Sequence, residues 1–260
     1  MEITSVNNDL VKEVVKLQQK KYRDKTCKFL LEGRKCIEEA ILAGLEIEYI
    51  FINKSAPTLP SHWGRVSEGQ EGVNFQLDKI IYTTEPVLKK ISTTDTPPDI
   101  VGVAYKKETK MPENAKKVVL LENIKDMGNL GTILRTSVAF GADAVVLYGK
   151  DCADIYNPKC VRSAVGNLWK IPVIYIDNFE ELKRMFKKFE CVATLPRAKE
   201  YLKDFEVKEP VLVMFGSEAD GLSDELVNFS SKQVKIEMSE TVESLNLSVS
   251  CAIVLYKLFA

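Results

Sequence analysis

The sequence predicts an α/β protein built from two domains, and three observations support this prediction. Apolar runs of strand length alternate with segments of helical period along most of the 260 residues. The composition, with 45% hydrophobic and 28% charged residues, is that of a folded globular chain and excludes disordered and collagen-like classes. A lysine-rich stretch that contains Pro112 interrupts the alternation, which places a domain boundary near residue 110.

The first domain is expected over residues 1–105 as a small α/β fold, followed by a linker at residues 106–116. Its expected helices are residues 8–25, 34–43 and 85–91, and its expected strands are residues 29–33, 48–52 and 73–77. Gly44 ends the second helix, because glycine adopts the left-handed conformation that closes helices. A further apolar run precedes the linker.

The second domain is expected over residues 117–260 as a parallel sheet with helices on both faces. Its expected strands are residues 118–123, 144–148, 173–176, 191–194 and 211–215, and its expected helices are residues 131–140, 179–189 and 244–259. The strand segments are nearly continuous apolar runs, which is typical of strands buried on both faces. The last helix is strongly apolar and must be covered.

Charge and cysteine usage restrict the possible partners and location. The chain has 36 basic and 37 acidic residues, so a polyanion must be met by a local patch rather than by a global positive field. The six cysteines form no Cys-x-x-Cys pair and there is one histidine, so neither a metal site nor a disulfide framework is expected. The pattern favours a reducing cytoplasm, and no apolar stretch approaches the ~20 residues of a membrane span.

The loops that follow the expected strands carry the candidate chemistry, because open parallel sheets bind ligands at the carboxyl ends of their strands. In the first loop, Gly131 and Arg135 lie on the opening turns of a helix, where anions are favoured. The pattern indicates either a phosphate contact or a turn glycine beside a surface arginine. It does not match the dinucleotide or P-loop motifs.

Two later loops offer further polar groups. In the second, Gly216 lets a ligand approach the backbone, and Glu218 can accept ribose hydroxyls or orient an arginine. The glycines there are equally explained by turn geometry alone. In the third, Ser244 and Asn246 begin the terminal helix, and Ser244 is explained without any function as its N-cap.

Together, the loops resemble in order and in residues the three motifs of the SpoU (TrmH) family of RNA ribose methyltransferases, in the SPOUT superfamily. The motifs read Asn129-x-Gly131-x-x-x-Arg135, Phe215-Gly-Ser-Glu218-x-x-Gly221-Leu and Ser244-Leu-Asn246-Leu-Ser-Val. A further family segment is similar to Asn157-Pro158-Lys159 with Arg162-Ser163 and Gly166. The first 105 residues, with Phe29-Leu-Leu-Glu32-Gly33, look like the ribosomal-protein-like substrate-binding domain that many members carry.

The resemblance implies a specific activity. Such proteins transfer the methyl group of S-adenosyl-L-methionine to a ribose 2′-oxygen in ribosomal or transfer RNA. They hold the cofactor in a C-terminal trefoil knot and usually work as homodimers whose active site crosses the interface. By motif match, Gly216, Ile236 and Leu245 bind the cofactor through backbone groups.

The same match assigns catalytic roles. Arg135 corresponds to the family's catalytic arginine, and its guanidinium stays protonated, so we expect it to clamp the target phosphate and stabilise alkoxide character. Asn129, Ser244 and Asn246 supply neutral hydrogen bonds to the ribose and the loops, whereas Glu218 orients a neighbour. For each residue a purely structural role in its loop is the alternative.

A basic run in the first domain is the candidate RNA contact. Lys20, Lys21 and Arg23 lie in a lysine-rich helix around Tyr22, and Arg34 follows the next strand. Such a helix can meet phosphates and stack a base, although runs of this kind are commonly solvated helix faces.

Departures from the family pattern keep other functions open. Glu237 and Glu240 stand where members commonly have proline and glycine, and Ala219 replaces a frequent glycine. The rival hypotheses are an RNA-binding or assembly module that keeps the knotted dimer but is catalytically impaired, and a transfer-RNA methyltransferase. A nucleotide-binding oxidoreductase is disfavoured, because no glycine fingerprint follows residues 118–121. The two-domain layout favours 23S ribosomal RNA over transfer RNA.

Overall fold

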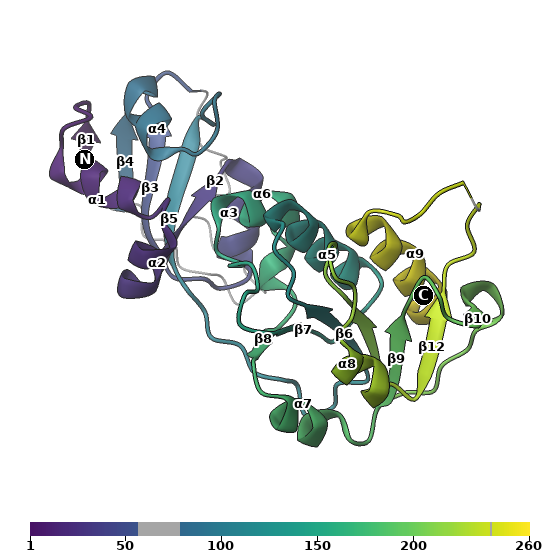
Figure 1. The fold of residues 1–260 in the computed structure, drawn as a ribbon. Helices are drawn as coiled ribbons and strands as arrows, with labels where there is room; N and C mark the ends of the chain where they lie inside the picture. The colour runs from purple at the N-terminus through teal and green to yellow at the C-terminus, as the bar shows by residue number, and fades with distance from the viewer. Residues whose placement is uncertain (57–78, 240) are drawn as a thin grey trace, which may run out of the picture. The chain divides into compact units, whose positions relative to one another are not determined.

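The computed structural model describes residues 1–56, 79–239 and 241–260, and the chain forms two compact units (Figure 1). Unit 1 comprises Met1–Glu108 with Asp154–Trp169, and unit 2 comprises Thr109–Ala153 with Lys170–Ala260. The predicted domain limits stay predictions. The segment Asp154–Trp169, which the sequence places inside the second domain, packs with unit 1.

Unit 1 is a five-stranded mixed sheet with the strand order β1-β4-β3-β5-β2. Its strands are β1 (Glu2–Ile3), β2 (Lys28–Glu32), β3 (Ile47–Asn53), β4 (Ile80–Thr83) and β5 (Ile100–Tyr105). Strand β5 runs antiparallel to β2 and β3, and the other pairs are parallel. The helices are α1 (Asp9–Lys16), α2 (Lys20–Thr26), α3 (Arg34–Leu42), α4 (Glu85–Ile91) and α6 (Pro158–Ala164), followed by the 3₁₀ turn η2 (Asn167–Trp169). The strand predicted at residues 73–77 lies outside the described residues.

The prediction of one helix over residues 8–25 is wrong, because the chain forms α1 and α2 with a break between them. In a continuous helix the carbonyl groups of Leu17 and Gln18 would accept hydrogen bonds from backbone amides four residues on. Here both carbonyl oxygens accept hydrogen bonds from Nη1 of Arg23, each at 2.9 Å. The arginine therefore satisfies the end of the first helix and allows the chain to turn.

Unit 2 is a seven-stranded, all-parallel sheet with the strand order β10-β12-β9-β11-β6-β7-β8. The strands are β6 (Lys117–Glu122), β7 (Ala144–Tyr148), β8 (Val173–Ile176), β9 (Glu190–Thr194), β10 (Glu200–Tyr201), β11 (Val211–Phe215) and β12 (Lys232–Lys235). The five strands predicted from apolar runs are all present. The sequence did not indicate β10, which has only two residues, or β12, which has a largely polar sequence.

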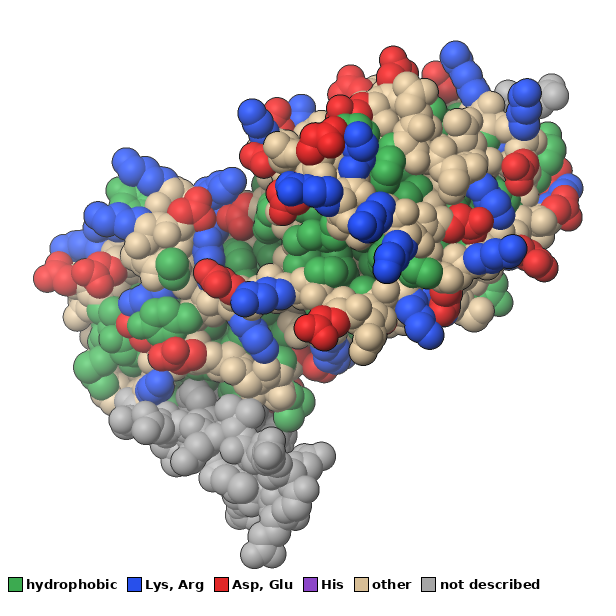
Figure 2. All heavy atoms as spheres, turned by 90° about the horizontal axis from the view of Figure 1, so that it is seen from below, with side chains coloured by type: hydrophobic (Ala, Val, Ile, Leu, Met, Phe, Trp, Pro, Cys, Tyr) green, Lys and Arg blue, Asp and Glu red, His purple; other side chains and the backbone are tan. Residues whose placement is uncertain are grey.

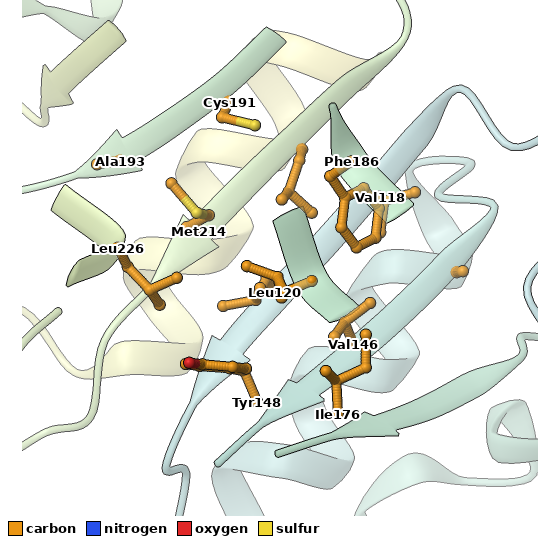
Figure 3. Close-up of a cluster of buried hydrophobic side chains, with 13 residues drawn as sticks. Val118, Leu120, Val146, Tyr148, Ile176, Phe186, Cys191, Ala193, Met214 and Leu226 are labelled. Carbon is orange, nitrogen blue, oxygen red and sulfur yellow. The ribbon is translucent and has the colours of Figure 1, made fainter. Parts of the chain in front are cut away.

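Helices cover both faces of this sheet, as predicted. They are α5 (Met127–Ala139), α7 (Phe179–Phe186), α8 (Asp224–Phe229) and α9 (Leu247–Phe259), with a 3₁₀ turn η3 (Leu202–Asp204). Figure 3 shows one face, where Leu120 and Val146 pack in a buried cluster with Phe186 of α7 and Leu226 of α8. The alternate strand residues, such as Val145, are buried on the opposite face, where α5 packs against β7 and α9.

The α/β class with a C-terminal parallel sheet is thus confirmed, while the trefoil knot stays a prediction. Because all seven strands are parallel, the loops after β6, β11 and β12 leave from the same edge of the sheet. That edge brings the three sequence motifs together. Among the described residues, none of the helices combines the length and apolarity needed to cross a membrane.

Candidate active site

Three polar side chains from three separate loops meet at the carboxyl edge of the unit 2 sheet. Nδ2 of Asn129, in the first turn of α5, donates to Oε1 of Glu218 at 2.7 Å. Nδ2 of Asn246, just before α9, donates to Oδ1 of Asn129 at 3.1 Å. Both ends of the Asn129 amide are therefore engaged, which fixes its orientation. We call Asn129, Glu218 and Asn246 the amide relay.

Each asparagine of the relay is held by the start of a helix. Asp126 is the N-cap of α5 and accepts a hydrogen bond from the backbone N–H of Asn129 at 2.7 Å. Asn246 is the N-cap of α9, where its Oδ1 accepts from the backbone N–H of Ser248 at 2.9 Å. The expectation that Ser244 caps this helix is wrong, since Ser244 is exposed and lies outside it. The N-cap of α9 is therefore Asn246, whose side chain also donates a hydrogen bond to Asn129.

Replacing Asn246 with alanine is expected to lower the free energy of unfolding by about 0.5–2 kcal/mol, because α9 loses its cap. Ser244→Ala is the matched control and should stay within about 0.5 kcal/mol of the wild type. Urea denaturation followed by circular dichroism measures both variants. Equal losses in the two variants would contradict the assignment of the cap to Asn246.

The loop that presents Glu218 requires glycine at its base. A Cβ added to Gly216 would lie 1.9 Å from the backbone carbon of Gly221, so no other residue fits without movement of the loop. Ser217 and Gly221 exchange two backbone hydrogen bonds of 3.2 and 3.1 Å, which close the turn. Gly221 has a φ of 71°, in the left-handed region. The motif's two glycines therefore shape the turn that carries the carboxylate.

Two carboxylates tie the next helix, α8, to the strand ends. Oε2 of Glu122, at the end of β6, accepts from the backbone N–H of Ser223 at 2.7 Å, and only 6% of Glu122 is exposed. Oη of Tyr148, at the end of β7, donates to Oε2 of Glu225 at 2.9 Å. Burial and the Glu225 carboxylate raise the pKa of Tyr148, so it remains a donor at neutral pH. The sequence reasoning missed these supports, although a glutamate ending an apolar run is a detectable signal for Glu122.

Arg135 is not part of the relay. It lies on α5 six residues beyond Asn129, about 9 Å along the helix axis. Its side chain is exposed and has no hydrogen bond or ion pair with the described residues. The guanidinium fork is therefore free to meet a group from outside this chain.

The three residues predicted to bind a cofactor surround the same edge. Gly216 follows β11, Ile236 follows β12, and Leu245 precedes the cap of α9. Within the described part of the chain, the backbone groups of Ile236 and Leu245 have no backbone hydrogen bond. Unpaired backbone donors and acceptors in these two loops suit a cofactor held by the main chain.

Glu237, the acidic residue that departs from the family pattern in the third motif, forms an ion pair with Lys203. Oε2 of Glu237 lies 2.7 Å from Nζ of Lys203, and both side chains are more than half exposed. The hydrogen bond and charge of Glu237 raise the pKa of Lys203. The carboxylate is therefore directed toward η3. Glu240 lies outside the described residues, and Ala219 is exposed near the loop tip.

The structure changes the candidate RNA contacts of unit 1. Lys20, Lys21 and Arg34 are exposed, as an RNA contact requires. Arg23 is only 1% exposed, and its Nε and Nη2 donate to Oδ2 of Asp154 at 3.0 and 2.7 Å. Arg23 is therefore buried and bound to groups of this chain, and its assignment as an RNA contact is corrected. Acidic and basic side chains are interspersed over the face in Figure 2, so contacts with RNA depend on local groups of basic side chains.

No group of histidine, cysteine, aspartate or glutamate side chains among the described residues could hold a metal ion. Five of the six cysteines are buried. Burial raises the pKa of Cys191 to about 12, so this thiol stays protonated at neutral pH.

The comparisons with known proteins agree with this arrangement. The SpoU rRNA Methylase family matches residues 116–256, and the MRM3-like substrate binding domain matches residues 8–102. The fold and the convergent loops define a two-domain protein with a methylase unit. The chain belongs to the SpoU rRNA methylase family.

Individual relatives span nearly the whole chain. The chain is 33% identical over 263 residues to the 23S rRNA (guanosine(2553)-2′-O)-methyltransferase RlmP of Bacillus subtilis, covering 99% of this chain and 98% of that protein. A solved RNA 2′-O ribose methyltransferase is 30% identical, with a TM-score of 0.82 over 99% of this chain and 97% of its own. An AdoMet-bound rRNA methyltransferase from Sinorhizobium meliloti is 27% identical, with a TM-score of 0.84 over 99% of this chain and 96% of its own.

Family membership confirms three of the predictions. The chain is an RNA 2′-O-methyltransferase, an enzyme, and its cofactor is S-adenosyl-L-methionine. The roles of individual site residues remain predictions, as do the RNA that is modified and the dimer.

Proposed function

We propose that this protein methylates a ribose 2′-oxygen in 23S ribosomal RNA. The amide relay carries the proposal, because it brings all three methyltransferase motifs to one edge of the sheet. The choice of 23S RNA is supported by the Bacillus subtilis relative, which spans the full length of this chain. The exposed lysines of unit 1, Lys20 and Lys21, together with Arg34, are the proposed RNA contacts outside the catalytic edge.

The proposed mechanism assigns alignment to the chain and the electrophilic methyl group to the bound cofactor. The main chain at Gly216, Ile236 and Leu245 holds S-adenosyl-L-methionine, whose sulfonium supplies the methyl group. The relay holds the amide of Asn129 in one orientation, from which it positions the ribose. Ser244 is exposed beside the relay and contributes a hydroxyl to the same loop.

Arg135 acts in this mechanism on the incoming RNA. Its guanidinium remains charged at any physiological pH, so it cannot serve readily as a base. Its exposed fork instead clamps the phosphate of the target nucleotide and stabilises negative charge that develops on the 2′-oxygen. As the 2′-oxygen takes the methyl group, its proton passes to that phosphate or to water, and the demethylated cofactor would leave as a neutral thioether.

A homodimer completes the proposal. Val249, Ile253 and Tyr256 are 46%, 39% and 67% exposed, although they belong to the most apolar helix, α9. Their spacing of four and three residues places them on one stripe of the helix. Because α9 packs on α5, which carries Arg135, a second copy seated on this stripe would lie next to the helix of Arg135.

Mapping of 2′-O-methyl marks in total RNA, from cells with and without the gene, tests the proposed substrate. We expect one ribose methyl group to disappear from 23S RNA, and purified protein with S-adenosyl-L-methionine to restore it on a 23S transcript. Loss of a mark from transfer RNA instead would favour the transfer-RNA alternative. Failure of the folded protein to bind the cofactor in calorimetry would favour the RNA-binding module. The proposed setting is the cytoplasm, where ribosomal RNA is modified.

A further inference from the structure

An exposed tyrosine lies between lysines at the edge of the unit 2 sheet, outside the amide relay. Tyr201 is 41% exposed and ends β10, the edge strand. Nζ of Lys235 lies 4.5 Å from the centre of its ring, and Nζ of Lys203 lies 5.4 Å from it. We call Tyr201, Lys203 and Lys235 the Tyr201 patch.

The register of the strands explains why these side chains gather. Strands β10 and β12 are parallel, and Tyr201 is directly paired with Lys235. Because side chains alternate along a strand, Glu200 points to the opposite face and leaves the basic side of Tyr201 clear. Two acids lie near the patch: Glu237, which is paired with Lys203 at 2.7 Å, and Asp204, which follows Lys203 in the chain.

The patch is continuous with the proposed cofactor segment. Lys235 is the last residue of β12, and Ile236 follows it in the chain. The patch therefore lies at the same carboxyl edge as the amide relay, on the side of the sheet where β10 ends. A strand of RNA presented to the cofactor can cross this edge.

The geometry points to the Tyr201 patch as a binding surface for single-stranded RNA that flanks the methylated nucleotide. A nucleobase stacks on the ring of Tyr201, and the ammonium groups of Lys235 and Lys203, which lie over this ring, move to the adjoining phosphates. This inference rests on the proposed function and adds a substrate contact on the methylase unit, separate from the lysines of unit 1.

Fluorescence anisotropy of a labelled 12-nucleotide oligoadenylate RNA tests the patch with the full-length protein. We expect Tyr201→Ala to weaken binding by roughly 5- to 150-fold, the range for loss of one stacked base. Tyr201→Phe keeps the ring and should bind within about twofold of the wild type. Lys235→Gln should make the slope of log affinity against log salt shallower by about 0.7.

Control variants separate the patch from other effects. Glu237→Gln removes the acid that neutralises Lys203 and is expected to tighten RNA binding. Lys187→Gln changes the exposed lysine that follows α7 and should leave the salt slope unaltered. Thermal unfolding of every variant should match the wild type, since the Tyr201 ring is exposed.

The inference would be overturned if Tyr201→Ala bound RNA with wild-type affinity and only Lys20→Ala and Lys21→Ala weakened binding. RNA contact would then be left to unit 1. That outcome is distinguishable from failure of the proposed function. In the latter case the wild-type protein itself would transfer no methyl group to 23S RNA, whatever the affinity of Tyr201→Ala for oligoadenylate.

Discussion

Replacing Arg135 with alanine is expected to lower the rate of methyl transfer by roughly 100- to 1,000-fold, the usual effect of removing one preorganised donor at a developing charge. The fold should be unaffected, because Arg135 is exposed and has no polar partner among the described residues. Cofactor binding, measured by calorimetry, should be unchanged. Single-turnover transfer of a radioactive methyl group to a 23S transcript measures the rate.

Two further variants test what the guanidinium does. Arg135→Lys keeps the charge but loses the bidentate fork, so we expect activity to remain strongly reduced. Arg184→Ala, an exposed arginine on α7, is the matched control and should be fully active. Near-normal turnover by Arg135→Lys would remove the need for the fork, and near-normal turnover by Arg135→Ala would remove the proposed role altogether.

Replacing Asp154 with alanine is expected to cost about 3–5 kcal/mol of folding free energy, the largest stability effect we expect for an ion pair in this chain. Arg23 and Asp154 have side chains that are only 2% and 7% exposed, with Nη2 and Oδ2 2.7 Å apart. Truncation of the aspartate would leave a buried guanidinium without its counter-ion. Chemical denaturation that follows unit 1 fluorescence measures the loss.

The expected origin of this loss can be checked with two controls. Asp9→Ala breaks an exposed ion pair with Lys12 and should change stability by less than about 1 kcal/mol. The double variant Arg23→Met with Asp154→Leu should be more stable than Asp154→Ala, because no charge remains buried. A double variant as unstable as the single one would show that the hydrogen bonds from Arg23 to the carbonyl groups of Leu17 and Gln18 dominate.

Another ion pair, between Glu32 and Arg162, also ties the segment Asp154–Trp169 to the rest of unit 1. Glu32 accepts hydrogen bonds from Ser92, Thr93 and Arg162, which belongs to the segment Asp154–Trp169. Rings of Tyr156 and Trp169 lie 4.8 and 5.3 Å from that of Phe29. The two family segments in the sequence, one in each predicted domain, are therefore packing partners in one unit. Their spacing along the chain could not reveal this.

The sequence motifs predicted which residues come together at the site better than they predicted what each residue does there. The glycines around Glu218 and the polar residues Asn129 and Asn246 were recognised from motif order, and the parallel sheet brings them together. Serine is a favoured N-cap, so the sequence predicts Ser244 as the cap of α9, but asparagine is equally favoured and Asn246 also reaches Asn129. Both residues suit the N-cap position, and the contact of Asn246 with Asn129, 117 residues away in the chain, decides between them.

The sequence by itself determined the strands of unit 2, because apolar runs that are buried on both faces have few alternatives. It also determined the family, through three ordered motifs. The tertiary structure alone decided which charges are exposed: Arg23 and Lys20 lie in one basic run, yet only Arg23 is buried. The burial of Arg23 depends on its pairing with Asp154, which lies 131 residues away in the chain. The solvation of a charged side chain is set by the groups that pack against it.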